Sequence, residues 1–345
     1  MIAVVKIGTS SITGVRGELD EAALVKLAAD LAGARAAGHR VVLVMSGAIA
    51  AGMPALGLEQ RPLDMGTLQA IAAVGQPRLL QRMSGLLATH DIVAGQVLLT
   101  PYDFVHRSQY LHARETLQRL LDLDVLPIVN ENDTVADDEI RYGDNDRLAA
   151  LVAHLLSAET LVMLTDTEGV FTADPRLDAG ASLIEEIVEV DEAMEKVAGG
   201  AGTDRGSGGM ASKLAAAKIA AWSGVRAVIA SAAVENVVGD ALAGRPVGTA
   251  FAQGAEGRVV VDAGARRALV EGNKSLLPAG VRGVEGDFDI DAPVEIVDED
   301  GHVFAKGLTR YRSTKLRTVA GKRTADLDDS LPHEVVHRDD LVVLP

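Results

Sequence analysis

Apolar runs rich in β-branched residues alternate with alanine-rich, helix-like stretches from residue 2 to residue 243, and this alternation limits the choice of fold. Continuous rather than alternating hydrophobicity indicates strands buried on both faces, as in parallel sheets between two helix layers. The expected order is strand 2–7, helix 20–37, strand 40–45, a long helical region through residue 88, strand 92–99, helix 110–121, strand 125–129, helix 147–157, strand 160–165, helix 210–222, strand 226–230 and helix 235–243. We therefore predict an α/β fold with a three-layer, doubly wound, mostly parallel sheet.

The pattern of the sequence changes after Phe251, at the segment AQGAEG, whose small residues predict a flexible linker. Beyond it, short valine-rich runs separated by Gly and Asp turns predict a compact β-rich domain. The 345 residues are enough for a main domain of roughly 250 residues and a smaller one. We predict a main domain over 1–252, a linker over 253–257 and a small β-rich domain over 258–345.

Composition excludes several classes of protein. The chain has no Cys, which rules out disulfides and thiolate chemistry. A formal net charge of −16 opposes general binding to polyanions. The N-terminus lacks the features of a secretory signal, and no run of about 18 apolar residues occurs. We expect a soluble, cytoplasmic protein that does not bind membranes.

Polar residues gather where the expected strands end, which is where ligands bind in open parallel sheets. Lys6 lies inside an apolar strand and would be costly to bury without an anionic partner. We interpret it as a phosphate ligand; the alternative is an edge-strand or snorkelling lysine. The turns at Gly8 and at Ser46-Gly47 offer backbone N–H groups that suit an anion, although a glycine turn taken alone more often reflects turn geometry only.

Two further polar clusters are NEND, residues 130–133, and GDND, residues 143–146. Asp or Asn before a helical run is an ordinary N-cap, but one residue is enough for a cap. Two such clusters near one sheet edge favour a binding site.

The segment RGSGGMASKLAAAK, residues 205–218, combines three glycines with Lys213 near the start of a helix. It is neither a Walker A loop, whose Lys follows the last Gly, nor a dinucleotide-binding G-x-G-x-x-G pattern. A glycine loop that is only a linker is the alternative. A Lys one turn into a helix points back toward the preceding loop, which favours a ligand there.

Together these residues fit phosphoryl transfer, which needs cations on the transferred group, carboxylates to organise them and polar groups for the acceptor. The three sets of candidates are Lys6 and Lys213; Asp146 and Asp166; and Ser46, Asp133 and Asn145. No His belongs to the set. This absence suits a carboxylate acceptor, because that nucleophile is already anionic and needs no general base.

The motifs VVKIGTS, VMSGAIAAG, LQAIAAVGQPRLL, VLPIVNENDTV, GDNDRLAAL, MLTDTEGVFTADPR and GSGGMASK together resemble the glutamate 5-kinase family of the amino acid kinase superfamily. The C-terminal part resembles the PUA domain that many bacterial members carry. The resemblance covers essentially the whole chain. It implies ATP-dependent phosphorylation of the γ-carboxylate of L-glutamate, the first step of proline biosynthesis.

By motif, the resemblance implies three groups of site residues. Catalysis would use Lys6, Lys213 and Asp146, with the carboxylate holding both lysines. Glutamate would be bound by Ser46, Asp133 and Asn145. ATP, with its Mg²⁺, would be bound by Lys6, Thr165, Asp166, Ser207, Gly208, Gly209, Met210, Ala211, Ser212 and Lys213. No residue is assigned as a metal ligand. The family commonly has Thr where this chain has Ser207 and Ser212, and both replacements keep a hydroxyl.

The resemblance also implies a homo-oligomer, either dimer or tetramer, and transfer of the product to glutamate-5-phosphate reductase. One alternative is another carboxylate or carbamate kinase on the same scaffold. A second, of a different class, is RNA binding through the basic stretch 309–323. Residues 258–345 carry 13 Lys and Arg against 16 Asp and Glu, and the stretch has one aromatic residue, so we expect a solvated or interdomain face rather than an RNA site.

Overall fold

The computed structural model describes residues 1–14, 18–135, 144–175, 177–178, 180–187, 194, 209–251, 257–270, 272, 274–290, 292–323, 326–328 and 331–343. The chain divides into two compact units. The first unit comprises Met1–Ala221 with Val225–Ala252, and the second comprises Trp222–Gly224 with Gln253–Pro345. Among the described residues, no helix combines the length and apolar character needed to cross a bilayer.

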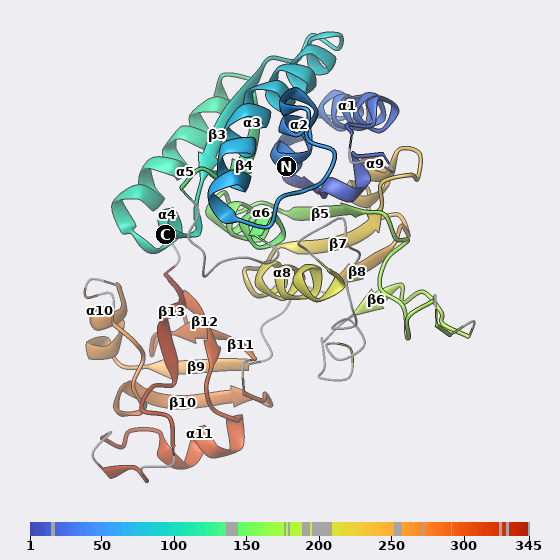
Figure 1. The fold of residues 1–345 in the computed structure, drawn as a ribbon. Coiled ribbons are helices and arrows are strands. Elements are labelled where there is room, and N and C mark those ends of the chain that lie inside the picture. The colour runs from blue at the N-terminus through green and yellow to red at the C-terminus, as the bar shows by residue number, and fades with distance from the viewer. Residues whose placement is uncertain are drawn as a thin grey trace. The chain divides into compact units, whose positions relative to one another are not determined.

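The first unit is built on an eight-stranded sheet in the order β3-β4-β2-β1-β5-β7-β8-β6 (Figure 1). Its strands are β1 (Ile2–Ile7), β2 (Arg40–Met45), β3 (Ala94–Leu99), β4 (Leu126–Glu131), β5 (Thr160–Thr165), β6 (Glu186–Ile187), β7 (Arg226–Ser231) and β8 (Thr249–Phe251). All neighbouring strands pair in parallel except β7 and β8, which are antiparallel. The predicted fold class, a doubly wound and mostly parallel α/β sheet, is confirmed.

Helices cover both faces of this sheet (Figure 1). They are α1 (Glu21–Ala36), α2 (Ala48–Gly52), α3 (Met65–Ala88), α4 (Pro101–Val105), α5 (Arg107–Asp122), α6 (Asp144–Leu155), α8 (Met210–Trp222) and α9 (Val237–Leu242). In β1, Val4 belongs to one core cluster with residues of α5, α6 and α8, whereas Ala3 and Val5 belong to a second cluster with residues of α1, α3 and α9. Successive strand residues thus supply two separate cores, which explains the continuous hydrophobicity of the strand sequences.

The structure differs from the sequence-based expectation mainly at element ends. The short strands β6 and β8 were not expected. Helix α6 begins at Asp144, three residues before the expected start, so Asn145 and Asp146 belong to its first turn rather than preceding it. Helix ends are hard to place from sequence because polar residues are common both as caps and in the first turn.

The second unit holds a five-stranded sheet in the order β10-β9-β11-β12-β13. The strands are β9 (Gly257–Val261), β10 (Val281–Gly286), β11 (Pro293–Val297), β12 (Val303–Thr309) and β13 (Val336–Val343). They enclose a separate core that includes Val259, Ile296, Phe304 and Tyr311. Two short helices, α10 (Ala263–Val270) and α11 (Ser313–Val319), were not expected, because each is too short for a clear helical period.

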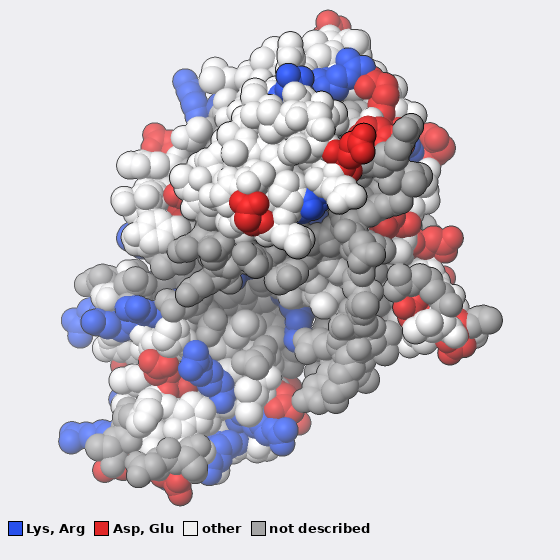
Figure 2. Space-filling view, in the orientation of Figure 1, with Lys and Arg blue, Asp and Glu red and all other residues white. Residues whose placement is uncertain are grey.

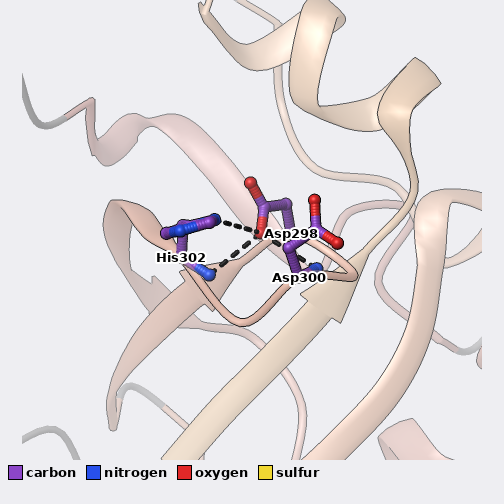
Figure 3. A group of neighbouring side chains, drawn as sticks. All are labelled: Asp298, Asp300 and His302. Atoms are coloured by element: carbon purple, nitrogen blue, oxygen red, sulfur yellow. Dashed lines mark hydrogen bonds and ion pairs between the residues drawn. The ribbon is translucent and has the colours of Figure 1, made fainter.

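Asp298, Asp300 and His302 lie together in the turn between β11 and β12 (Figure 3). Asp298 Oδ1 accepts hydrogen bonds from the backbone N–H groups of Asp300 at 3.1 Å and His302 at 2.9 Å. These bonds and the backbone pair from Gly301 N to Asp298 O close the turn. The cluster is therefore explained by turn formation.

Helices α2 and α3 touch through small residues. A Cβ atom added to Gly75 would lie 1.7 Å from the carbonyl oxygen of Ala48, and one added to Gly52 would lie 2.2 Å from that of Ile71. The backbones approach so closely that only glycine fits at these positions. This contact fixes the position of α3 against α2.

Gly75→Ala should therefore lower the free energy of unfolding by about 1–3 kcal/mol, because the methyl group forces two helices apart. Gly85 in the same helix is a matched control, since nothing lies within 4 Å of its added Cβ. Gly85→Ala should raise the free energy of unfolding by about 0.5–1 kcal/mol through helix propensity. Urea unfolding of both variants measures the difference; equal effects would contradict the proposed close contact.

Candidate functional site

Three charged side chains from three elements meet at the carboxyl end of the main sheet. The carboxylate of Asp146, in the first turn of α6, lies 2.5 Å from Lys6 Nζ and 3.3 Å from Lys213 Nζ. Their side chains are 1%, 5% and 8% exposed, respectively. Lys6 lies on β1, between β2 and β5, so the alternative of an edge-strand lysine is wrong.

The two lysines and one carboxylate carry a net charge of +1 in a buried position. Burial disfavours the ionised form of Asp146, but the charges of Lys6 and Lys213 and hydrogen bonds from Lys6 and Ser212 outweigh it and hold the pKa of Asp146 below its ordinary value. Burial also lowers the pKa of Lys6; Lys213 adds to that effect and Asp146 opposes it. The site is thus suited to an anion that can share the surplus positive charge.

The start of α8 joins the same group. Ser212 Oγ lies 2.7 Å from Asp146 Oδ2 and 2.8 Å from the carbonyl oxygen of Gly209. Met210 and Ala211 form the first turn of α8, next to Ser212 and Lys213. The predicted ATP residues Ser207 and Gly208 lie outside the described residues. The described part of the glycine-rich segment therefore leads into the charged group.

A second, uncharged network adjoins the first through Asn145. Asn145 Nδ2 donates to Ser46 Oγ at 3.0 Å, and Asn145 Oδ1 accepts from the backbone N–H of Glu131 at 3.2 Å. The same N–H donates to Asn130 Oδ1 at 2.9 Å, and Asn130 Nδ2 donates to Gln76 Oε1 at 2.7 Å. Elements β2, β4, α3 and α6 are thereby linked by side-chain amides.

The β2–α2 connection places Ser46 at this point. Ser46 N donates to the carbonyl oxygen of Ile7, which ties the end of β2 to the end of β1. Gly47 follows with φ 110°, and a Cβ there would lie 3.0 Å from Ile12 Cδ1. Glycine is therefore required at the sharp turn that leads from the strand into α2.

Asp133 follows β4 and lines a cavity of about 250 Å³. The other lining residues are Ala72, Ala73, Gln76, Pro77, Gln96, Leu98, Glu131, Asn132 and Thr134. Gln76 and Glu131 belong both to this cavity and to the amide network. The predicted acceptor residue Asp133 therefore lies beside the network that contains Asn145 and Ser46.

Thr165 ends β5 and Asp166 follows it, at the same edge of the sheet as the end of β1. Thr165 is buried, whereas Asp166 is exposed, and Thr165 Oγ1 donates to Asp166 Oδ1 at 3.1 Å. Their assignment to ATP remains a prediction.

Sequence reasoning missed the contribution of Gln76 and left Asn130 and Glu131 without individual roles. The signal was present, because NEND was recognised as a polar cluster and Gln76 stands within the quoted motif LQAIAAVGQPRLL. A single glutamine on a helix is nevertheless usually solvated. Only the folded structure shows that Gln76 of α3 contacts Asn130 of β4.

Comparison with known proteins places this geometry in a family. An amino acid kinase family model matches residues 1–231, and a PUA domain model matches residues 257–331. The chain is 46% identical to a glutamate 5-kinase of Myxococcus xanthus over 99% of this chain and 96% of that protein. It is 45% identical to a glutamate 5-kinase of Ralstonia pickettii with the same two coverages. The chain belongs to the glutamate 5-kinase family.

Solved structures agree with the fold of this family. An isopentenyl phosphate kinase matches with a TM-score of 0.52 at 18% identity, covering 73% of this chain and 100% of that chain. A UMP kinase from Ureaplasma parvum matches with a TM-score of 0.50 at 16% identity, covering 73% of this chain and 98% of that chain. At these identities, the likeness shows the amino acid kinase fold alone.

Asp146→Asn should lower the free energy of unfolding by about 3–5 kcal/mol at neutral pH, because two buried lysines lose their counter-charge. The pKa of Asp146 is lower in the folded state than its unfolded value of 3.8. The ionised carboxylate therefore stabilises the folded state above pH 3.8, and this stabilisation is lost as the pH falls through the folded-state pKa. Urea unfolding at neutral and acidic pH measures the effect, which should shrink in acid.

Asp166→Asn is the matched control, since Asp166 is exposed. Its effect on unfolding should stay within about 0.5 kcal/mol. A similar loss in both variants would mean that the charged group does not depend on Asp146.

Proposed function

We propose that the protein transfers the terminal phosphoryl group of ATP to the γ-carboxylate of L-glutamate, which forms L-glutamate 5-phosphate and ADP in the first step of proline biosynthesis. A carboxylate oxygen forms the new bond to phosphorus as the bond to the bridging oxygen of ADP breaks. The observation that carries the proposal is the Asp146 carboxylate between two buried lysines, beside the Asn145–Ser46 pair, in a chain of this family.

In this proposal, Lys6 and Lys213 neutralise the oxygens of the transferring phosphoryl group, and Asp146 keeps the two ammonium groups in register. Preorganised charge of this kind stabilises a transition state without reorganisation during the reaction. Ser46, Asn145 and Asp133 bind glutamate. Thr165, Asp166 and residues 207–213 bind ATP. We propose catalytic bounds of 1–252, a linker over 253–257 and a PUA-like domain over 258–345.

Mg²⁺ fits as the companion of ATP rather than as a resident ion of the protein. Magnesium takes oxygen ligands and is often held by substrate phosphates with one or two carboxylates. Asp146 is engaged by two lysines and Ser212, whereas the carboxylate of Asp166 is exposed at the same sheet edge. We therefore propose that Asp166 contacts the magnesium ion. The ion would offset the negative charge of the ATP phosphates. We also propose a cytoplasmic homo-oligomer, dimer or tetramer, that passes its product to glutamate-5-phosphate reductase.

The second unit gives little support to the RNA-binding alternative, because several basic side chains of stretch 309–323 are already paired and its tyrosine is buried. Arg312 pairs with Asp289 at 2.7 Å, Arg310 with Glu334 at 3.9 Å, and Arg317 donates to the carbonyl oxygen of Gly286. Tyr311, the aromatic residue of the basic stretch, is 2% exposed and unable to stack on bases. Basic and acidic residues of this unit are interspersed on the face seen in Figure 2.

Lys6→Ala and Lys213→Ala should each lower kcat by at least about a hundredfold, because a cation on the transferring group contributes several kcal/mol. Glutamate-dependent ADP release, with hydroxylamine trapping of the acyl phosphate, measures the loss. Lys315→Ala, in the second unit, should keep normal turnover. A kcat above about a tenth of wild type in either active-site variant, an effect of only about 1.4 kcal/mol, would contradict these roles.

Asp133→Asn should raise the KM for glutamate far more than the KM for ATP, because it removes a charge partner of the substrate ammonium. Asn145→Ala should act in the same direction, since Asn145 positions Ser46. Steady-state kinetics with each substrate varied in turn, together with acetylglutamate, aspartate and carbamate as acceptors, tests the assignment. Equal weakening of glutamate and ATP would indicate a general structural role for NEND.

A further inference from the structure

The backbone N–H of Glu131 fixes the orientation of two side-chain amides. A backbone N–H can only donate, so both groups that face it, in Asn130 and Asn145, present their oxygen atoms. Each amide then presents its –NH₂ group on the opposite side. Asn145 directs this group to Ser46 Oγ, and Asn130 directs it to Gln76.

The orientation of Gln76 follows from the same logic. Because Asn130 offers a donor, Gln76 faces it with Oε1, at 2.7 Å. The –NH₂ group of Gln76 is then left as a pure donor, with no hydrogen bond to any of the residues that the structure describes. Gly75, the preceding residue, lies in the close contact between α2 and α3, and this contact fixes the backbone position of Gln76.

Gln76 lines the cavity of about 250 Å³ that Asp133 also lines. Pockets for drug-sized ligands are commonly about 300–1,000 Å³, so this one suits a small polar group. It offers a donor from Gln76 and a carboxylate from Asp133. A donor and an anion that line one small cavity match the carboxylate and ammonium groups on the α-carbon of a free amino acid.

We propose that Gln76 is a specificity-determining residue whose –NH₂ group donates to the α-carboxylate of the acceptor, while Asp133 receives the α-ammonium. This inference rests on the proposed function and adds the residue that distinguishes an amino acid from a simple carboxylic acid or amine. Asn130 and the Glu131 N–H act as positioning groups, because they hold the Gln76 amide in the donating orientation.

The test compares three acceptors that share the reacting carboxylate: L-glutamate, 4-aminobutyrate, which lacks the α-carboxylate, and glutarate, which lacks the ammonium. Each is assayed as a substrate by ADP release or, where turnover is too slow, as a competitive inhibitor against glutamate. The key variant is Gln76→Glu, which keeps an acceptor oxygen for Asn130 but replaces the donor with a negative charge. Gln76→Leu removes both, and Gln81→Leu, exposed on the same helix, is the matched control.

Gln76→Glu should lower kcat/KM for glutamate by about tenfold or more, the effect of one lost hydrogen bond to a charged group. Its effect on 4-aminobutyrate should stay within about threefold by the same reasoning, because that molecule lacks the group that Gln76 binds. Asp133→Asn should instead reduce the preference for glutamate over glutarate. Gln81→Leu should match wild type, and thermal melts establish that each variant is folded.

Gln76→Glu with wild-type kinetics, alongside an impaired Gln76→Leu, would overturn the proposal and leave a purely structural role through Asn130. Equal losses for glutamate and 4-aminobutyrate in Gln76→Glu would overturn it too, since the α-carboxylate would then be irrelevant. Both outcomes leave the proposed function standing. A folded wild-type protein without glutamate-dependent ADP release would overturn the proposed function and this inference together.

Discussion

The Asp146 carboxylate between Lys6 and Lys213 is the interaction on which the rest of the site depends. Two buried ammonium groups repel each other, and one carboxylate in contact with both makes their burial tolerable. The three residues come from β1, α6 and α8, so the ion pairs also fix where the two helices begin relative to the central strand. A change at any of the three would alter both charge and geometry.

Much of this could be predicted from the sequence because burial leaves a clear pattern. Strands β1, β2 and β5 have the bounds that their apolar runs indicate, since both faces of each strand are covered. Lys6 was identifiable because a lysine inside such a run demands an anionic partner. The run of alanines after the glycine-rich segment likewise indicated α8, which begins at the expected residue, Met210.

The amide network could not be predicted in the same way. Gln76 stands within a motif of the family, but its helical position alone does not distinguish it from the exposed Gln81 five residues later. The difference lies in tertiary packing, where Gly75 brings α3 against α2 and so places Gln76 near β4. The roles of Thr165 and Asp166, and of residues 207 and 208, likewise rest on motif alone.

Asn145 and Asp146 show how the first turn of one helix contributes to two different networks. Consecutive residues on a helix point about 100° apart, so neighbouring side chains face different partners. Asn145 joins Ser46 and the amide network, whereas Asp146 joins the two lysines. Under the proposed function, the helix backbone sets the separation between the acceptor side and the phosphoryl side. Under the same proposal, charges and donors held by such contacts meet the condition for electrostatic preorganisation.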